Sequence, residues 1–553
     1  MSKQRQNNQG RSGMALVVVM VIVTLVALAA YGFNQQMTDA YRSSQLQIER
    51  AQARLTALSA IEALRSSLEQ PRGTRMTWHH AAPELFTAVP LEPDSGATEN
   101  DEPRWSFSVL APTAPAVTEN ATETAPSWRF GLTNESAKIN LLVLDQWARA
   151  EPGQATKTLM NLPGMSLPMA QAILRAYDIN DTASATATSL GDRLGSPTSV
   201  NTPGISSVDS ASDNDGAAQW ARQWAMHWTG GDWDQNYQLD SLELTLAGEQ
   251  SSPGQPSSIA SSTDAAPPAW RDYLTFDSGQ KNESLNGQPR VFLNGSDLQK
   301  LHQDLLAIWP ADWANFVIAV RQFGIRRPLS SGSGSSVISA AQWTPDFSIP
   351  ATVRITSSLE LVGATVEIRQ PKGNPLPMRS PFSDDFGDRS NYIRSLVDDV
   401  TVNPSPVIVG QVDVMEASRA VLLGVPAMTA EIADQIIQRR AAQSSSAPPS
   451  GTEASRDTIA WLFVENIVDL PTLIKIQPWI TVGGDCYHAQ IVAFKDPFSP
   501  TFRCTVTLDG TAPQVAVRNF RQWDAWGKGF SIDDLRGELS PKTNLDHASS
   551  NLP

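Results

Sequence analysis

The sequence predicts an α+β fold in which a long N-terminal transmembrane and amphipathic helix packs on an antiparallel sheet, and a large, mostly α-helical insertion interrupts that sheet. Three observations predict it. An apolar stretch near the N-terminus continues into an amphipathic pattern of helical period. Past Pro478, apolar and polar residues alternate at period two, as in antiparallel strands. Between these regions, three segments repeat the order of short strand and helix, with Ser/Ala/Pro/Gly-rich spacers.

The N-terminal helix is expected to run from Met14 to about Gln70. Residues 14–33 are long and apolar enough to cross a bilayer. The basic residues before them, Lys3, Arg5 and Arg11, place the N-terminus in the cytoplasm. Beyond the membrane an amphipathic stripe follows, formed by Ile48, Ala51, Leu55, Leu58 and Ile61. A cleaved secretory signal ending near Ala27-Leu28-Ala29 is the alternative, but the apolar run is long for a signal and the helix continues past it.

This N-terminal architecture resembles the type IV pilin and pseudopilin class. In that class a prepilin peptidase cuts after a glycine before the apolar run, which corresponds to Gly13 here, and Met14 becomes the new, normally N-methylated first residue. Most such subunits carry a glutamate at the fifth mature position, where this chain has Val18. The glutamate pairs with the N-terminal amine of the subunit above, and an unpaired carboxylate in lipid is costly. Val18 therefore indicates a subunit at the tip of a fibre.

Within type II secretion systems, the large minor pseudopilin that lacks this glutamate is general secretion pathway protein K. The chain is similar to that family from Arg11 to about Phe530, and "AKINLLVLD" and "GQVDVMEAS" resemble its strand-to-helix signature. The resemblance implies a single-pass protein of the inner membrane, mostly periplasmic, that starts and caps the pseudopilus and supports export across the outer membrane. Its implied partners are other minor pseudopilins, the inner-membrane assembly platform and the prepilin peptidase.

The resemblance also implies a domain organisation. It comprises a leader (1–13), the N-terminal helix (14–70), a pilin-like α/β domain in two parts (71–145 and 478–530), the insertion (146–477) and a flexible tail (531–553). The spacers within the insertion are residues 181–216, 247–268, 329–341 and 441–456, which contain little apolar surface to bury.

Three similar units make up the insertion, and they begin near residues 135, 287 and 410. The first and third share a hairpin, Pro163-Gly164-Met165-Ser166 and Pro426-Ala427-Met428-Thr429, in which Ser166 and Thr429 are expected to cap the next helix. Ala170, Ile173, Ala433 and Ile436 are expected to face inward. The units resemble helix-hairpin-helix modules, which bind the DNA backbone.

A membrane-anchored DNA-handling protein of a competence-like system is therefore the alternative function. The net charge of -15 disfavours it, because an acidic protein repels nucleic acid. We therefore interpret the units as structural helix pairs and expect no nucleic-acid partner.

The late segments "DCYHAQIVAF", "FRCTVTL" and "PQVAVRNF" predict consecutive antiparallel strands. With "RWSFSVL" and "WRFGLT" they are expected to form the sheet on the extramembrane half of the helix. Cys486 and Cys504 lie on the first two of these strands. A disulfide between them is possible, but the register of the strands decides it and the sequence leaves that register open.

One acidic stretch, "GDWDQNYQLDSLEL", has the spacing of an EF-hand-type calcium loop. Its candidate ligands are Asp232, Asp234, Asn236, the carbonyl of Gln238, Asp240 and Glu243. Tyr237 stands where glycine is preferred for a left-handed turn, at a cost of roughly 1–2 kcal/mol. The alternative is an acidic surface loop. The family resemblance favours Ca²⁺, because K-type pseudopilins bind calcium.

Motifs of catalysis are missing from the sequence. None of the six histidines lies in an HExxH or zinc spacing, and the sequence contains no GxSxG motif and no P-loop. We expect a protein without enzymatic activity; an anchored enzyme with an unrecognised site is the third alternative.

Overall fold

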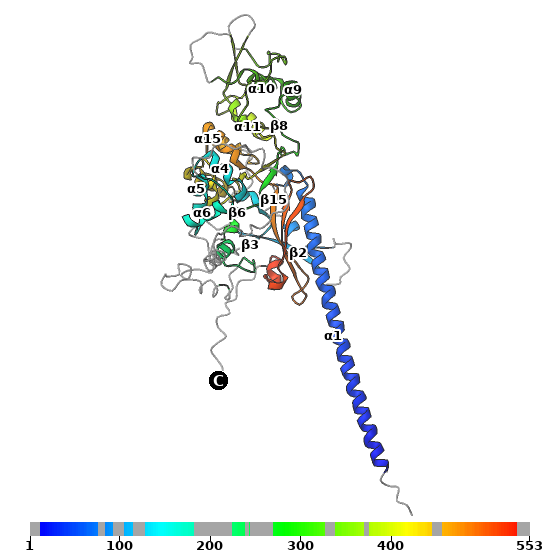
Figure 1. Ribbon diagram of the computed structural model, residues 1–553. Helices are drawn as coiled ribbons and strands as arrows, with labels where there is room; N and C mark the ends of the chain where they lie inside the picture. Colours follow the sequence, from blue (N-terminus) through cyan, green and yellow to red (C-terminus); the bar gives the residue numbers. More distant parts are fainter. Residues whose placement is uncertain are drawn as a thin grey trace, which may run out of the picture.

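The computed structural model describes residues 11–75, 83–91, 104–113, 128–181, 224–237, 243, 269–326, 338–369, 375–444 and 456–538. One long helix, α1 (Arg11–Leu68), leads into the molecule, and its N-terminal half extends away from all other elements (Figure 1). From Leu16 onward this helix is long and apolar enough to cross a membrane. Pro71, which has no N–H to donate, follows its last turn. The predicted helix Met14–Gln70 is therefore confirmed to within three residues.

The sheet is antiparallel, and its seven strands come from two parts of the chain that are far apart in sequence. The early strands are β1 (Val89–Pro90), β2 (Ser106–Pro112), β3 (Trp128–Phe130) and β4 (Thr133–Asn134). The late strands are β15 (Cys486–Phe494), β16 (Phe502–Asp509) and β17 (Ala516–Gln522). The order is β1-β2-β15-β16-β17, with β3 beside β2 and β4 beside β15. The predicted late strands and their union with the early ones are confirmed.

Small residues of α1 allow the helix to approach the sheet closely. Ala53, Ala57 and Ala60 are fully buried there, together with Ile61 and Leu64, against β15, β16 and β2. The expected apolar stripe is therefore only partly the buried face. Ile61 faces the sheet, whereas Ile48, Leu55 and Leu58 are exposed on another face of the helix.

The central segment between β4 and β15 contains three units, each opened and closed by a two-residue strand, and the two strands pair in parallel. The pairs are β5 (Ile139–Asn140) with β6 (Leu274–Thr275), β8 (Val291–Phe292) with β11 (Val400–Thr401), and β13 (Val412–Asp413) with β14 (Ile480–Thr481). Each closing strand ends in a threonine that is buried, namely Thr275, Thr401 or Thr481. This closing strand is a part of the repeat that the sequence did not reveal.

Helices fill each unit between its two strands. They are α4 (Leu144–Ala150), α5 (Gln154–Met160) and α6 (Leu167–Ala176) in the first, α9 (Leu298–Leu306), α10 (Ala311–Phe323) and α11 (Arg389–Asp398) in the second, and α12 (Arg419–Gly424), α13 (Ala430–Ser444), α14 (Trp461–Val464) and α15 (Leu470–Ile476) in the third. Two further strand pairs are β7 (Gly279–Lys281) with β12 (Val407–Val409), and β9 (Thr365–Ile368) with β10 (Leu376–Arg379). Residues 224–229 are also helical, and further short helices are α2 (Arg72–Arg75), α3 (Pro83–Phe86) and α16 (Ile532–Leu535).

The shared hairpin of the first and third units has the same left-handed turn in both. Gly164 and Ala427, which are equivalent in the two hairpins, both have positive φ, at 70° and 61°. The four residues expected to face inward are buried: Ala170, Ile173, Ala433 and Ile436. Thr429 Oγ1 accepts a hydrogen bond from the N–H of Ile432, as an N-cap does. Ser166 occupies the N-cap position, but its side chain makes no capping hydrogen bond, so the cap expected there is not formed.

A single hydrophobic cluster runs through all three units, and separate clusters lie on the two faces of the sheet. Three of the largest buried side chains in the central segment are tryptophans, Trp147, Trp270 and Trp461. These tryptophans are core residues.

The register of β15 and β16 excludes a bond between Cys486 and Cys504. Cys486 lies opposite Asp509, and Cys504 lies opposite Ile491, five residues further along β15. At about 3.4 Å per residue the two thiols are separated by roughly 17 Å along the strands, and both cysteines are free and buried.

Two boundaries in the structure differ from those expected from the sequence. The ordered part continues past residue 530, because Ile532 and Leu535 of α16 are buried against the sheet. The last spacer begins later than residue 441, because α13 extends to Ser444. Most other spacer residues lie outside the described part of the chain, although residues 338–341 of the third spacer are described and Ile338 forms a β-bridge with Met378.

Candidate functional site

The start of α1 carries the candidate processing site. Gly13 and Met14 lie within the first turns of the helix, and no charged side chain occurs between Arg11 and Asp39. Val18 is exposed on the helix surface, as are the neighbouring apolar side chains. Thr24, the hydroxyl in the middle of this stretch, bonds back to the carbonyls of Met20 and Val21. The hydroxyl in the middle of this segment can therefore lie in lipid with its hydrogen bond satisfied.

Above the apolar stretch, α1 presents an uncovered apolar face. Leu55 is 60% exposed and Leu58 is 38% exposed, and Ile48, also exposed, lies about two to three turns before them along the helix. The opposite face of the same turns is buried on the sheet. An apolar helix face of this kind can pack against a second helix that runs alongside it.

Three carboxylates of the predicted calcium loop converge in the structure. Asp232, Asp234 and Glu243 each offer one oxygen, and these oxygens all lie within 4.8 Å of one another. Asp232 and Glu243 are buried and Asp234 is half-buried. Asn236 lies in the same loop, whereas Gln238 and Asp240 lie outside the described residues.

The loop adopts the turn that the EF-hand spacing requires. Tyr237, at the sixth position, has φ of 62°, although a bulky residue is disfavoured there. Its N–H donates to Asp232 Oδ2, and the N–H of Asn236 donates to Asp232 Oδ1 and Asp234 Oδ1. Glu243 Oε1 closes the loop by accepting from the N–H groups of Trp233 and Asp234 at 2.8 and 3.2 Å.

Contacts with the sheet hold the loop in place and offset the backbone strain. Gln490 on β15 donates to the carbonyl of Gln235 at 2.7 Å. The Tyr237 ring packs near Phe530, with ring centroids 6.4 Å apart. The acidic loop therefore lies at the junction between the central segment and the sheet.

Two buried arginines, which the sequence did not single out, face the acidic cluster. Arg271 donates to Asp232 Oδ2 at 2.7 Å. Arg503 on β16 forms an ion pair with Asp234 Oδ2 at 3.5 Å and, within the described structure, has no hydrogen-bond partner for its side chain. Burial raises the pKa of Asp234 to about 6; the charges of Asp232 and Glu243 add to this rise, and Arg503 opposes it. Three carboxylates therefore face two fixed positive charges.

The donor set fits a hard divalent cation. Calcium binds oxygen at about 2.3–2.6 Å, so ligand oxygens around one ion lie at most about 5 Å apart. The three converging carboxylates satisfy this limit, and Arg271 is shared with a further carboxylate, Asp272, at 4.0 Å, so the two arginines do not neutralise the cluster. Asp232 Oδ1, Asp234 and Glu243 are the groups that would hold the ion, with Glu243 able to use both oxygens.

The three described histidines have separate surroundings. His227 stacks on Trp270, His302 bonds to Asn315, and burial lowers the pKa of His488 to about 4. Burial also raises the pKa of both Cys486 and Cys504, so neither is a ready nucleophile.

Comparison with known proteins adds no assignment: no family description, curated protein or solved structure matches this chain.

Proposed function

We propose that the chain is a minor pseudopilin of a type II secretion system and that it occupies the tip of the pseudopilus. The observation that carries the proposal is α1 itself. It is a continuous helix whose first half is apolar and uncovered and whose last turns pack on an antiparallel sheet (Figure 1). Gly13 immediately before the apolar run supports processing by a prepilin peptidase, and Val18 supports the tip position.

The exposed face of α1 is the proposed contact with other minor pseudopilins. Leu55 and Leu58 can pack against a neighbouring α1 helix while the sheet stays attached to the opposite face. The apolar half would hold the subunit in the inner membrane before assembly, with the sheet and the central segment in the periplasm. The net charge of -15 supports this function over the handling of DNA.

We further propose that Asp232, Asp234 and Glu243 hold one Ca²⁺. When bound, the ion would supply the positive charge that the buried carboxylates lack. Since the loop touches β15 and β16 through Gln490 and Arg503, the ion would stabilise the junction between the central segment and the sheet.

The mature N-terminus is the direct test of the pseudopilin proposal. Mass spectrometry of the protein purified from cells with an active prepilin peptidase should give a first peptide beginning at N-methylated Met14. Gly13→Ala should leave most of the protein uncut, whereas Gly32→Ala, also within α1 and with open space around it, should be processed normally. A mature protein that begins near residue 30, or one that keeps residues 1–13, would contradict the proposal.

A further inference from the structure

Exposed apolar side chains lie in three loops of the antiparallel sheet. Phe498, in the turn between β15 and β16, is 97% exposed. Trp526, four residues after β17, is 58% exposed, and Leu91, directly after β1, is 42% exposed. No role proposed above uses these side chains.

The pairing of the strands places all three residues at the same end of the sheet. This end comprises the end of β15, the starts of β2 and β16, and the end of β17. Leu91 belongs to it because its N–H donates to the carbonyl of Trp105, directly before β2, at 3.1 Å. At the opposite end, the loop of residues 510–515, which the structure describes throughout, exposes no large apolar side chain.

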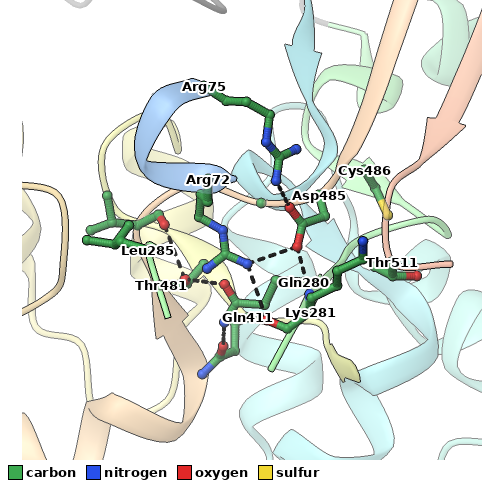
Figure 2. A network of polar contacts seen from close by, with 12 residues as sticks. Arg72, Arg75, Gln280, Lys281, Leu285, Gln411, Thr481, Asp485, Cys486 and Thr511 are labelled. Atoms are coloured by element: carbon green, nitrogen blue, oxygen red, sulfur yellow. Dashed lines mark hydrogen bonds and ion pairs between the residues drawn. The ribbon is translucent and has the colours of Figure 1, made fainter. Parts of the chain in front are cut away.

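This end of the sheet faces the apolar half of α1. At the other end, Asp485, directly before β15, accepts a hydrogen bond from Arg72 at 2.8 Å, just past the end of α1 (Figure 2). Trp105 Nε1, beside the strand end that contains Phe494, donates to Gln52 Oε1 at 3.0 Å. The strand from residue 485 to residue 494 and the largely helical chain from residue 52 to residue 72 both measure about 30 Å. β15 therefore runs alongside α1, and the chain that leaves it points toward the apolar half of α1 (Figure 1).

The turn that presents Phe498 is held by its own hydrogen bonds. Asp496 accepts from the N–H groups of Phe498 and Ser499, both at 2.8 Å, and from the Ser499 hydroxyl at 2.5 Å. Lys528 Nζ donates to the carbonyl of Pro497 at 2.6 Å, which ties the turn to the segment after β17. The aromatic ring is therefore presented by a fixed turn, and covering it with an apolar surface would gain free energy.

A bilayer that holds the apolar half of α1 is within reach of this turn. Phe498 lies four residues past Phe494, so the turn extends up to about 13 Å beyond Gln52, to the level of about residue 44 of α1. The apolar run ends at Phe33, about 16 Å further along the helix. Headgroups fill about 5–8 Å outside the hydrocarbon. If α1 tilts by about 30° toward the sheet, which lies about 10 Å from the helix axis, the turn comes to about 9 Å from the hydrocarbon, where the Phe498 side chain meets the headgroups.

We propose that this end of the sheet rests on the surface of the membrane that α1 spans, with Phe498 and Trp526 at the level of the lipid headgroups. Aromatic side chains are favoured in that layer of a phospholipid bilayer. Lipid is the occupant because the same chain that anchors α1 also directs this end of the sheet toward the membrane. The inference rests on the membrane anchoring in the proposed function and does not depend on assembly with other pseudopilins.

The test measures the depth of a nitroxide attached to Phe498→Cys. The full-length protein is placed in bilayer discs of phosphatidylcholine and phosphatidylglycerol. Cys486 and Cys504 are buried, so the introduced thiol is the accessible one. Collisions of the nitroxide with oxygen, which concentrates in lipid, and with a water-soluble nickel chelate report whether the label lies in lipid or in water.

The matched control is Phe386→Cys. Phe386 is also an exposed phenylalanine, at 67%, and it lies three residues before α11, remote from the apolar half of α1 (Figure 1). We expect the ratio of oxygen to chelate collisions at residue 498 to exceed that at residue 386 by at least about twofold, because oxygen partitions into an apolar phase and the chelate into water. Equal ratios at the two positions would overturn the proposal.

A label at Val23→Cys separates failure of this inference from failure of the anchoring. Val23 is 59% exposed in the middle of the apolar half of α1. Lipid contact at residue 23 together with water contact at residue 498 overturns this inference alone. Water contact at both positions overturns the anchoring and this inference with it. Protection of residue 498 that requires other pseudopilins assigns the surface to a protein contact, which also overturns the inference.

A second label tests whether Phe498 holds this end of the sheet on the lipid. With the nitroxide at Trp526→Cys, the added change Phe498→Asp should lower the ratio of oxygen to chelate collisions by at least about twofold, because a carboxylate is costly near hydrocarbon. Phe386→Asp makes the same change at the control position and should leave the ratio unchanged. Phe498 and Phe386 are both exposed, so neither change alters the core. An unchanged ratio with Phe498→Asp would show that this ring does not contact lipid and would overturn the proposal.

Discussion

Glu243 is the residue at which the cation site can be tested with least disturbance to the fold. Glu243→Gln keeps an oxygen for the N–H groups of Trp233 and Asp234 but removes the charge and the bidentate contact. We expect the stabilisation gained on adding Ca²⁺ to fall by about 1.4 kcal/mol for each tenfold loss of affinity. The measurement is the melting temperature with and without Ca²⁺.

The control for this experiment is Asp304→Asn, which removes one exposed carboxylate elsewhere on the surface. This variant should keep the full gain with Ca²⁺. An equal gain in the wild type and in Glu243→Gln would place any bound calcium outside the acidic loop.

Asp485 is the buried charge on which the joint between α2, β7 and β15 depends (Figure 2). Burial alone would raise its pKa, but Arg72, Arg75 and the N–H of Lys281 outweigh burial and lower the pKa to about 2. The folded pKa is thus below the ordinary value of 3.8. This carboxylate therefore stabilises the fold fully above about pH 4, and its contribution is lost as the pH falls toward 2.

Asp485→Asn should accordingly destabilise the protein at neutral pH by about 3–5 kcal/mol, because it removes a buried carboxylate that pairs with two buried arginines. Asp145→Asn breaks a partly exposed pair with Arg149 and should cost less than about 1 kcal/mol. The measurement is unfolding by urea at pH 7 and pH 3, where the difference between Asp485→Asn and the wild type should shrink at the lower pH. A difference that is the same at both pH values would contradict the lowered pKa.

Sequence spacing predicted the site residues that lie close together in the chain, but not those that come from distant segments. The positions of Asp232, Asp234 and Glu243 follow from one twelve-residue pattern, and the structure brings them together. Arg271 and Arg503 come from other segments, so no local pattern could place them at the same site. The unfavourable Tyr237 turn forms because the ring packs near Phe530, a contact that only the folded chain contains.

Among the elements, the repeated hairpin offers a paired experiment, because equivalent positions carry different residues. Gly164 and Ala427 both have positive φ, which alanine adopts at a cost of about 1 kcal/mol. Gly164→Ala should destabilise the first unit by about that amount, since the added methyl would be in ordinary contact with His227 at 3.6 Å. Ala427→Gly should stabilise the third unit, by up to about 1 kcal/mol.

The free energy of unfolding of each variant, obtained by chemical denaturation and compared with that of the wild type, tests both predictions. Opposite signs are the expected result, because the same backbone conformation gains a side chain in one hairpin and loses it in the other. Two changes of the same sign would show that the hairpins differ in more than this residue.

Elements with strong periodicity were predictable, and short ones were not. β15 and β16 are nine and eight residues long, and although only β16 alternates throughout, these lengths are enough for period two to be seen. The closing strands β6, β11 and β14 have two residues each, so they have no period to detect. They form because each lies parallel to the opening strand of its own unit, which is a tertiary relation. The sequence could not decide whether Cys486 and Cys504 are bonded, because the answer depends on the register between β15 and β16, which is also a tertiary relation.

The two ends of α1 differ: one end is an uncovered apolar helix, and the other carries the bulk of the protein. The apolar half of α1 extends alone, whereas the sheet and the three units gather around its other end (Figure 1). The chain between β4 and β15 is far longer than a connection within a sheet needs. Repeated copies of such a segment along a thin fibre would collide, whereas one copy at the end has free space above it.

The proposed tip position yields the last prediction, and it depends on Val18 together with this bulk. In a growing pseudopilus each new subunit joins from below, and a glutamate at the fifth mature position pairs with the amine of the subunit above. The uppermost subunit has no such neighbour, so a carboxylate there would stay unpaired in lipid at a cost of about 3 kcal/mol. Val18 avoids this cost and also makes the chain a poor addition beneath another subunit. Immunogold labelling of sheared pseudopili should therefore place this protein at one end of each fibre. Val18→Glu should not move the label into the shaft, because the central segment still prevents copies of this chain from stacking. Labels spread along wild-type fibres, or fibres built from this chain alone, would contradict the tip position.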